Sequence, residues 1–203
     1  MSEIYLGNPN LKKANTQIQF SAEQIEEFLK CKNNPVYFAQ KYVKIVSLDE
    51  GLVPFQPYKF QEKLIKRFHK NRFNICKMPR QTGKSTTVVS YLLHYAVFND
   101  SVNIGILANK AATARELLGR LQTAYENLPK WMQQGVLVWN RGSLELENGS
   151  KILAASTSAS AVEVCLSTFF FWMSSPLFLI ILLTRSLPLY ILLLLLAKTP
   201  KSS

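Results

Sequence analysis

The sequence predicts an α/β fold in which a parallel sheet is flanked by helices. The first observation is an alternation between residues 73 and 128, where short apolar runs are followed by longer segments with helical periodicity. The second is a glycine-containing loop between the first of these runs and the next helix. Strands that alternate with helices pair in parallel, because each helix carries the chain back across the sheet.

The N-terminal part is predicted to be mainly helical. Residues 1–20 are expected to form an irregular arm. Ser21 then opens a capping box with Gln24, which predicts a helix over about residues 22–30. A short apolar segment, PVYFAQKYV, follows from Pro35. The next helix is predicted in YKFQEKLIKRFHK, where one face carries Phe60, Leu64 and Phe68.

The central part supplies the alternating elements. FNICKM (73–78) is predicted to be a buried strand, and STTVVSYLLHYAVF the helix after the loop. VNIGILA (102–108) fits a second strand, and AATARELLGRLQTAYENL a second amphipathic helix. Alternating residues around Asn148-Gly149 then predict a β-hairpin.

Charge favours a polyanionic partner. The net charge is +11, and all 13 acidic residues and 21 of the 24 basic ones precede Val164, which leaves +8 in that part. Such a balance suits nucleic acid, because neutralised phosphates release counterions. A solvated lysine-rich surface is the alternative. Three unpaired cysteines (Cys31, Cys76 and Cys165) indicate neither a disulfide framework nor a zinc site.

The loop resembles the phosphate-binding consensus G-x-x-x-x-G-K-[ST]. Gly83, Lys84 and Ser85 fit it, whereas Met78 stands at the leading glycine. This chemistry needs backbone amides around the phosphates, a lysine on the β and γ oxygens, and a hydroxyl on magnesium. A helix that starts after the loop adds its N-terminal dipole. The pattern therefore predicts a P-loop NTPase-type fold that binds ATP and magnesium.

Further side chains have a functional and a structural interpretation. Arg80 could stabilise charge at the γ-phosphate or pair with a carboxylate. Gln61 lies upstream of the loop in the sequence, at a separation typical of an adenine-sensing glutamine in helicase-like ATPases. The alternative is that Gln61 is an exposed helix residue. Four cations could contact DNA phosphates or be solvated: Lys77, Arg115, Arg120 and Arg141. Two histidines are interpreted as structural: His69 and His94.

Over about residues 30–162 the chain closely resembles the ATPase domain of the large terminase subunit of tailed bacteriophages. The motifs that carry the resemblance are PRQTGKS, GILANK, LPKWMQQGVLVWNRGSLELENGS and AASTSASAV, in that order. The resemblance implies catalytic roles for Arg80 and Lys84, and magnesium binding by Ser85. It implies nucleotide binding by Gln61, Arg80, Gln81, Thr82, Gly83, Lys84 and Ser85.

The same resemblance implies a function. Members of the family hydrolyse ATP to package double-stranded DNA into a procapsid, and full-length members carry a nuclease domain. Portal protein, the small terminase subunit and further copies of the same chain are the implied partners, and the host cytoplasm the location. Membrane association is not expected. The alternatives are a helicase-like, nucleic-acid-dependent ATPase and a non-enzymatic, membrane-associated protein with a vestigial loop.

One departure from the family is decisive. The family next has an apolar strand that ends in Asp-Glu, but no acidic residue follows Glu163. Shifting the reading frame by one base converts the codons of Trp172 and Met173 into Asp, preceded by Leu and followed by Glu or Val. We therefore expect a one-base frameshift near Val162, with residues 163–203 out of frame and this chain poor in hydrolysis.

The predicted organisation has three parts. Residues 1–57 form an N-terminal arm and helical subregion, and residues 58–162 a partial P-loop ATPase domain. Residues 163–203 form an apolar tail that is not natively folded, so the sheet is incomplete on its C-terminal side. A membrane span over residues 176–197 is the rival interpretation of the tail, although Arg185 and Pro188 interrupt it.

Overall fold

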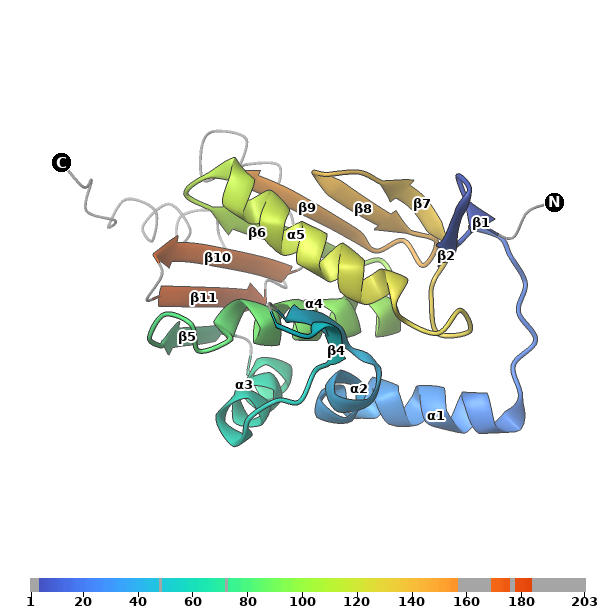
Figure 1. Cartoon of the computed structure of the whole chain (residues 1–203), viewed down its shortest axis with the longest axis horizontal. Coiled ribbons are helices and arrows are strands. Elements are labelled where there is room, and N and C mark those ends of the chain that lie inside the picture. The colour runs from blue at the N-terminus through green and yellow to red at the C-terminus, as the bar shows by residue number, and fades with distance from the viewer. Residues whose placement is uncertain (1–3, 48, 72, 157–168, 176–177, 184–203) are drawn as a thin grey trace.

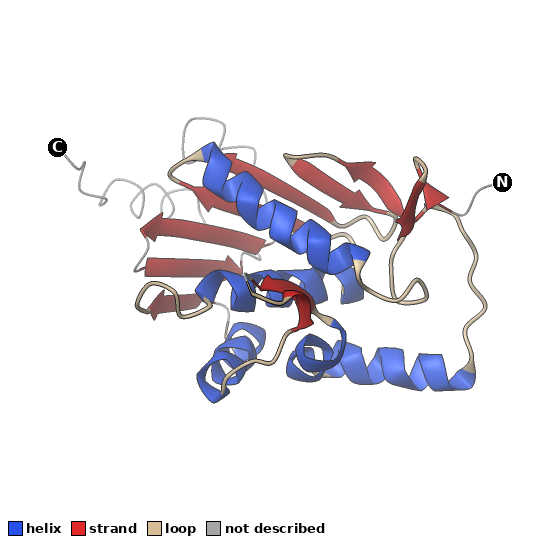
Figure 2. Cartoon of the chain, in the orientation of Figure 1, coloured by secondary structure: helices blue, strands red, loops and turns tan. Residues whose placement is uncertain are grey.

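The computed structural model describes residues 4–47, 49–71, 73–156, 169–175 and 178–183. A seven-stranded sheet forms its centre, and two small two-stranded sheets lie beside it. Figure 1 shows helix α5 lying across the sheet, with helices α1 to α4 gathered along one side. Figure 2 shows the same separation of helices and strands by colour.

The helices follow the predicted order. Their bounds are α1 Ala22–Asn33, α2 Pro35–Tyr42, α3 Lys59–Lys70, α4 Lys84–Phe98 and α5 Ala111–Glu126. The predicted capping box is confirmed at α1, where the Ser21 side chain accepts from the Gln24 amide and the Gln24 side chain from the Ser21 amide. Helix α1 extends to Asn33, beyond the predicted end, and Asn34 then caps α2.

The strands fall into three sheets. Two hairpins stand apart: β1 Ile4–Tyr5 with β2 Asn8–Lys12, and β3 Lys44–Ser47 with β4 Gly51–Pro54. The central sheet contains β5 Phe73–Lys77, β6 Asn103–Ala108, β7 Val136–Trp139, β8 Ser143–Leu146, β9 Lys151–Ser156, β10 Phe169–Ser175 and β11 Phe178–Leu183. Its order is β5-β11-β10-β6-β9-β8-β7.

The central sheet is mixed, so the predicted α/β class is confirmed but the expected parallel sheet of P-loop NTPase type is not. Strand β6 pairs in parallel with β9 and with β10, but the other neighbours are antiparallel. Short connections explain three of these pairs, β7–β8, β8–β9 and β10–β11, because parallel neighbours need a crossover of a dozen or more residues. The fourth pair, β5–β11, joins strands that are distant in the chain. The predicted hairpin is confirmed: β8 and β9 pair around Asn148-Gly149, and Gly149 has a φ of +79° that favours glycine.

The core lies between the sheet and α5 and continues around α4, against which α2 and α3 also pack. Helix α4 is buried almost all round, so its sequence shows little polar face. Two predicted core residues are exposed instead: Phe60 (45%) and Ile75 (71%). Ile75 lies on β5, an edge strand. Phe60 stacks against Tyr58, with ring centroids 5.8 Å apart, so only Leu64 and Phe68 of the predicted face are buried.

Residues 4–20 are more ordered than the expected irregular arm. Strands β1 and β2 form a hairpin, and Leu11 is buried in the core. The Glu147 carboxylate accepts from Lys12 Nζ at 3.3 Å and from the Asn15 amide at 2.9 Å. Glu147 of the β8–β9 turn therefore helps to anchor the N-terminal segment, together with Glu126 and Gln133, through long-range contacts that the local sequence does not indicate.

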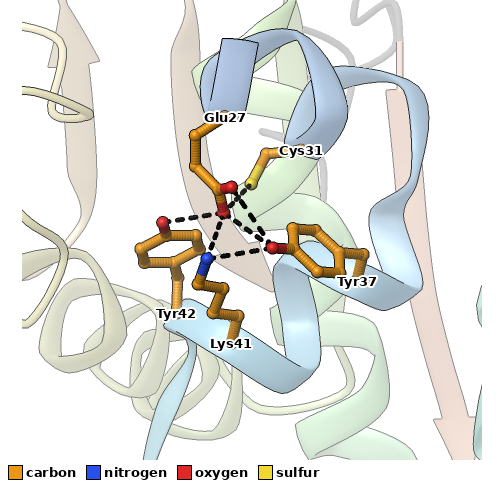
Figure 3. Close-up of polar contacts among 5 residues, drawn as sticks. All are labelled: Glu27, Cys31, Tyr37, Lys41 and Tyr42. Carbon is orange, nitrogen blue, oxygen red and sulfur yellow. Dashed lines mark hydrogen bonds and ion pairs between the residues drawn. The ribbon is translucent and has the colours of Figure 1, made fainter. Parts of the chain in front are cut away.

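A second carboxylate joins α1 to α2. Glu27 of α1 accepts hydrogen bonds from Lys41 Nζ at 2.7 Å and from the Tyr37 and Tyr42 hydroxyls at 2.9 Å (Figure 3). The hydrogen bond from Lys41 is the largest cause that lowers the Glu27 pKa, to about 2. Burial raises the pKa of the neighbouring Cys31 thiol to about 12.

The tail is described only in part. The backbone of β10 and β11 extends the sheet between β6 and β5, whereas the proposed frameshift junction and most of the rival membrane span lie outside the described residues. Within the described ranges, no helix combines the length and apolarity needed to cross a membrane.

Candidate functional site

The predicted phosphate-binding loop connects β5 to α4. Gln81 and Gly83 have left-handed φ values of +60° and +70°, and α4 begins immediately afterwards at Lys84. Successive turn residues with such backbone angles can form an anion-binding nest, and a helix N-terminus adds unpaired amides and a favourable dipole. The backbone therefore has the features of a phosphate-binding loop although Met78 replaces the leading glycine.

Lys84 folds back over this loop. Its Nζ donates to the Met78 carbonyl at 3.1 Å and also contacts the Pro79 carbonyl. The Thr82 hydroxyl donates to the same Pro79 carbonyl at 3.0 Å. Burial lowers the Lys84 pKa. The ammonium is thus held at the mouth of the loop by weak neutral acceptors, which an anion could replace.

Gln61 lies against the loop from α3. Its side chain is 3% exposed, which contradicts the alternative of an exposed helix glutamine. Its Nε2 lies 3.4 Å from the Thr82 carbonyl and 3.5 Å from that of Gly83, while its Oε1 accepts from the Tyr58 amide at 2.8 Å. A Cβ built on Gly83 would collide with Nε2. The loop and α3 are therefore packed as one unit.

Arg80 and Ser85 occupy different settings. Arg80 is exposed, and within the described part of the chain no carboxylate pairs with it, which removes support for its structural interpretation. Ser85 is half-buried in the first turn of α4, next to Lys84. The described residues contain no group of three or more histidines, cysteines or acids that could hold a metal.

The arrangement offers hydrogen-bond donors and a positive charge that suit an anion. Loop amides, the α4 N-terminus and Lys84 suit a polyphosphate. Magnesium held by few protein ligands needs phosphate oxygens and water in addition, and here Ser85 alone of the predicted residues would contact it.

Three of the remaining predicted residues, Arg115, Arg120 and His94, make their contacts away from the loop. Arg120 pairs with Glu116 at 2.6 Å, and Arg115 Nε donates to its own helix at the Ala111 carbonyl. His94 is buried, with Nε2 2.9 Å from the Cys31 carbonyl. Burial lowers its pKa to about 4.

Sequence reasoning missed one hydroxyl at the site. The Thr87 side chain donates to the Gly83 carbonyl at 2.9 Å and so secures the start of α4. Its spacing of four residues from Gly83 is the signal that could have indicated this bond, because helix hydroxyls often bond to the carbonyl one turn earlier.

Comparison with known families agrees with this geometry. Residues 75–163 match the family described as terminase large subunit, T4likevirus-type, N-terminal. The match covers the loop and the elements from β5 to β9, whereas Gln61 on α3 lies before it. The predicted resemblance is confirmed over this part: residues 75–163 are similar to the N-terminal part of the terminase large subunit.

Proposed function

We propose that this chain is the ATP-binding part of a viral DNA-packaging motor, with the nucleotide phosphates held by the loop from Arg80 to Ser85. The family match supports a terminase role in DNA packaging. The observation that carries the nucleotide assignment is Lys84, whose Nζ rests on two loop carbonyls at the N-terminus of α4. In this proposal a phosphate replaces those carbonyls as the partner of the ammonium.

Each loop residue has a distinct role in the proposal. Lys84 neutralises charge on the β and γ phosphates, and Ser85 contacts magnesium together with phosphate oxygens and water. Gln61 keeps the loop and α3 in register through its contacts with Thr82 and Gly83. Arg80, exposed on the loop, is placed to meet developing charge on the transferred phosphoryl group.

We also propose that the chain binds ATP but hydrolyses it poorly, because the carboxylates that would activate water are missing. Strand register supports the frameshift hypothesis. Trp172 pairs with Leu107 of β6 and with Ile180, which in turn pairs with Ile75 of β5. Strands β5, β6 and β10 run in the same direction, so β10 ends at the sheet edge from which the loop emerges. A frame-restored Asp at residues 172–173 would therefore lie beside Leu107 and Ala108, the last two residues of β6.

Binding of an ATP analogue with magnesium, measured by calorimetry on the full chain, tests the first proposal. Lys84→Ala should weaken binding by about 10- to 100-fold, since a hydrogen bond to a charged group is worth roughly 1.5–3 kcal/mol. The matched control is Lys110→Ala, an exposed lysine that directly precedes α5 and should leave affinity unchanged. Equal affinity of the chain and the Lys84 variant would contradict the nucleotide site.

Restoring the reading frame near codon 162 tests the second proposal. The restored chain should hydrolyse ATP at a measurable rate that Lys84→Ala abolishes, whereas the present chain should not. Rapid, Lys84-dependent turnover by the present chain would contradict the assignment of a hydrolysis defect. The frameshift would be contradicted by two observations together: an intact reading frame in this gene, and related genes that do not encode Leu-Asp-Glu at this position.

A further inference from the structure

The outer face of α3 carries a row of cations. Five side chains are exposed, whereas Gln61, Leu64, Ile65 and Phe68 form the buried face of the helix. At 3.6 residues per turn the five lie within about 100° of one another, and at 1.5 Å per residue they extend over roughly 16 Å. We call this set the α3 basic row: Lys59, Lys63, Lys66, Arg67 and Lys70.

In the described part of the chain, no ion pair joins an acidic residue to the row, although Glu62 lies one helical turn from Lys59 and from Lys66. The ion pairs found there involve Lys12, Lys41, Arg120 and Lys151, and none involves the row. The acidic residue of α3 is Glu62, whose carboxylate accepts from Gln40 Nε2 at 2.9 Å. Like charges spaced three or four residues apart destabilise a helix, so an anionic partner along the row would relieve a local cost.

The row borders the nucleotide loop. A groove of about 380 Å³ separates α3 from β5, and its lining includes Lys63 and Arg67 of the row, Lys77 of β5, and Met78 where the loop begins. Gln61 joins the other side of α3 to the loop backbone. An anionic polymer bound along the row would therefore contact the helix that packs against the predicted ATP site.

We propose that the α3 basic row binds the phosphate backbone of double-stranded DNA. The choice of DNA among polyanions rests on the proposed packaging function, whereas the geometry requires only a line of phosphates. Cations one helical turn apart on a convex face suit a duplex backbone that passes outside the protein, without base readout. Binding should be independent of DNA sequence and steeply dependent on salt.

The test compares two triple variants of the full chain with equal loss of charge. Lys63→Gln, Lys66→Gln and Arg67→Gln together remove the centre of the row. Lys32→Gln, Lys44→Gln and Lys110→Gln together remove three exposed cations elsewhere. Fluorescence anisotropy with a labelled mixed-sequence 30-base-pair duplex gives the affinity at several salt concentrations, and circular dichroism checks the fold of each variant.

The row variant should bind duplex DNA at least about tenfold more weakly at 100 mM salt, with a salt slope shallower by about 2 to 3, while the control variant changes little. ATP affinity should stay unchanged in the row variant, and Lys84→Ala should keep its DNA affinity. If the parent chain did not bind ATP but still bound DNA through the row, only the nucleotide proposal would be overturned.

Two results would overturn the row as a duplex-binding surface. The first is an equal loss of affinity in both triple variants, which would indicate a diffuse charge effect. The second is tighter binding of a single-stranded oligonucleotide that depends on Tyr58 and Phe60, because the exposed stacked pair would then act as a base-stacking platform.

Discussion

Substituting Gly83 by alanine tests the packing between the loop and α3. Two costs can be separated. Gly83 has φ +70° and ψ 21°, a left-handed conformation that costs other residues about 1–2 kcal/mol. In addition, an added Cβ would approach Gln61 Nε2 to less than 3.0 Å, a separation that real Cβ contacts essentially never show. The clash can be relieved by moving or removing Gln61, but the backbone strain cannot.

A double-mutant cycle measures the two costs by urea denaturation of the full chain. Gln61→Ala alone should lower the free energy of unfolding by about 1–3 kcal/mol, because the Tyr58 amide loses its buried acceptor. Gly83→Ala alone should cost its backbone strain plus the clash. The double variant should lose about 0.5–3 kcal/mol less free energy of unfolding than the two single losses added together, the range for residues in contact.

Nucleotide binding provides a second measurement on the same variants. Gly83→Ala should bind ATP more weakly, because the loop must rearrange around the displaced Gln61 side chain. The double variant should recover part of that loss. Strict additivity of the unfolding free energies, or full ATP affinity in Gly83→Ala, would refute the close packing of the loop against α3.

Two further predictions concern pH. Burial depresses the His94 pKa from 6.5 to about 4, so the stability that the neutral side chain confers is complete above pH 6.5 and falls by up to about 3 kcal/mol as pH drops to 4. In urea denaturation between pH 8 and 4, His94→Gln should make the free energy of unfolding depend less on pH. An unchanged pH dependence would contradict the depressed pKa of His94. The Glu27 pKa is depressed from 4.5 to about 2, so its stabilising contribution is present above pH 4.5 and declines as pH falls towards 2. Glu27→Gln keeps the shape but removes the charge and should cost about 1–2 kcal/mol at pH 7, with Glu23→Gln on the same helix as control; equal effects of the two substitutions would contradict the hydrogen-bonded role of Glu27.

Local sequence signals predicted the positions of the helices and of the loop. The capping box at Ser21, the periodicity of α3 and α5, and the Asn148-Gly149 turn depend on neighbouring residues, so they could be identified without tertiary information. Arg80 to Ser85 were assigned to the site in the same way, and the structure places them in one loop at the start of α4.

Strand order and burial could not be predicted in this way. The strands β5 and β6 follow each other as predicted, but β11 and β10 lie between them, because pairing joins segments that are distant in the chain. The exposure of Ile75 follows from its place on an edge strand, and hydropathy alone suggested a buried position.

The sequence by itself determined the helices, the phosphate-binding motif and the resemblance to the terminase large subunit, because these depend on residue types at fixed spacings. Only the tertiary structure decided that Gln61 is buried against Gly83, that Glu147 anchors the N-terminal segment, and that five α3 cations face solvent beside the loop. These features depend on which surfaces meet when helices and sheet pack together, and sequence spacing does not encode that pairing directly.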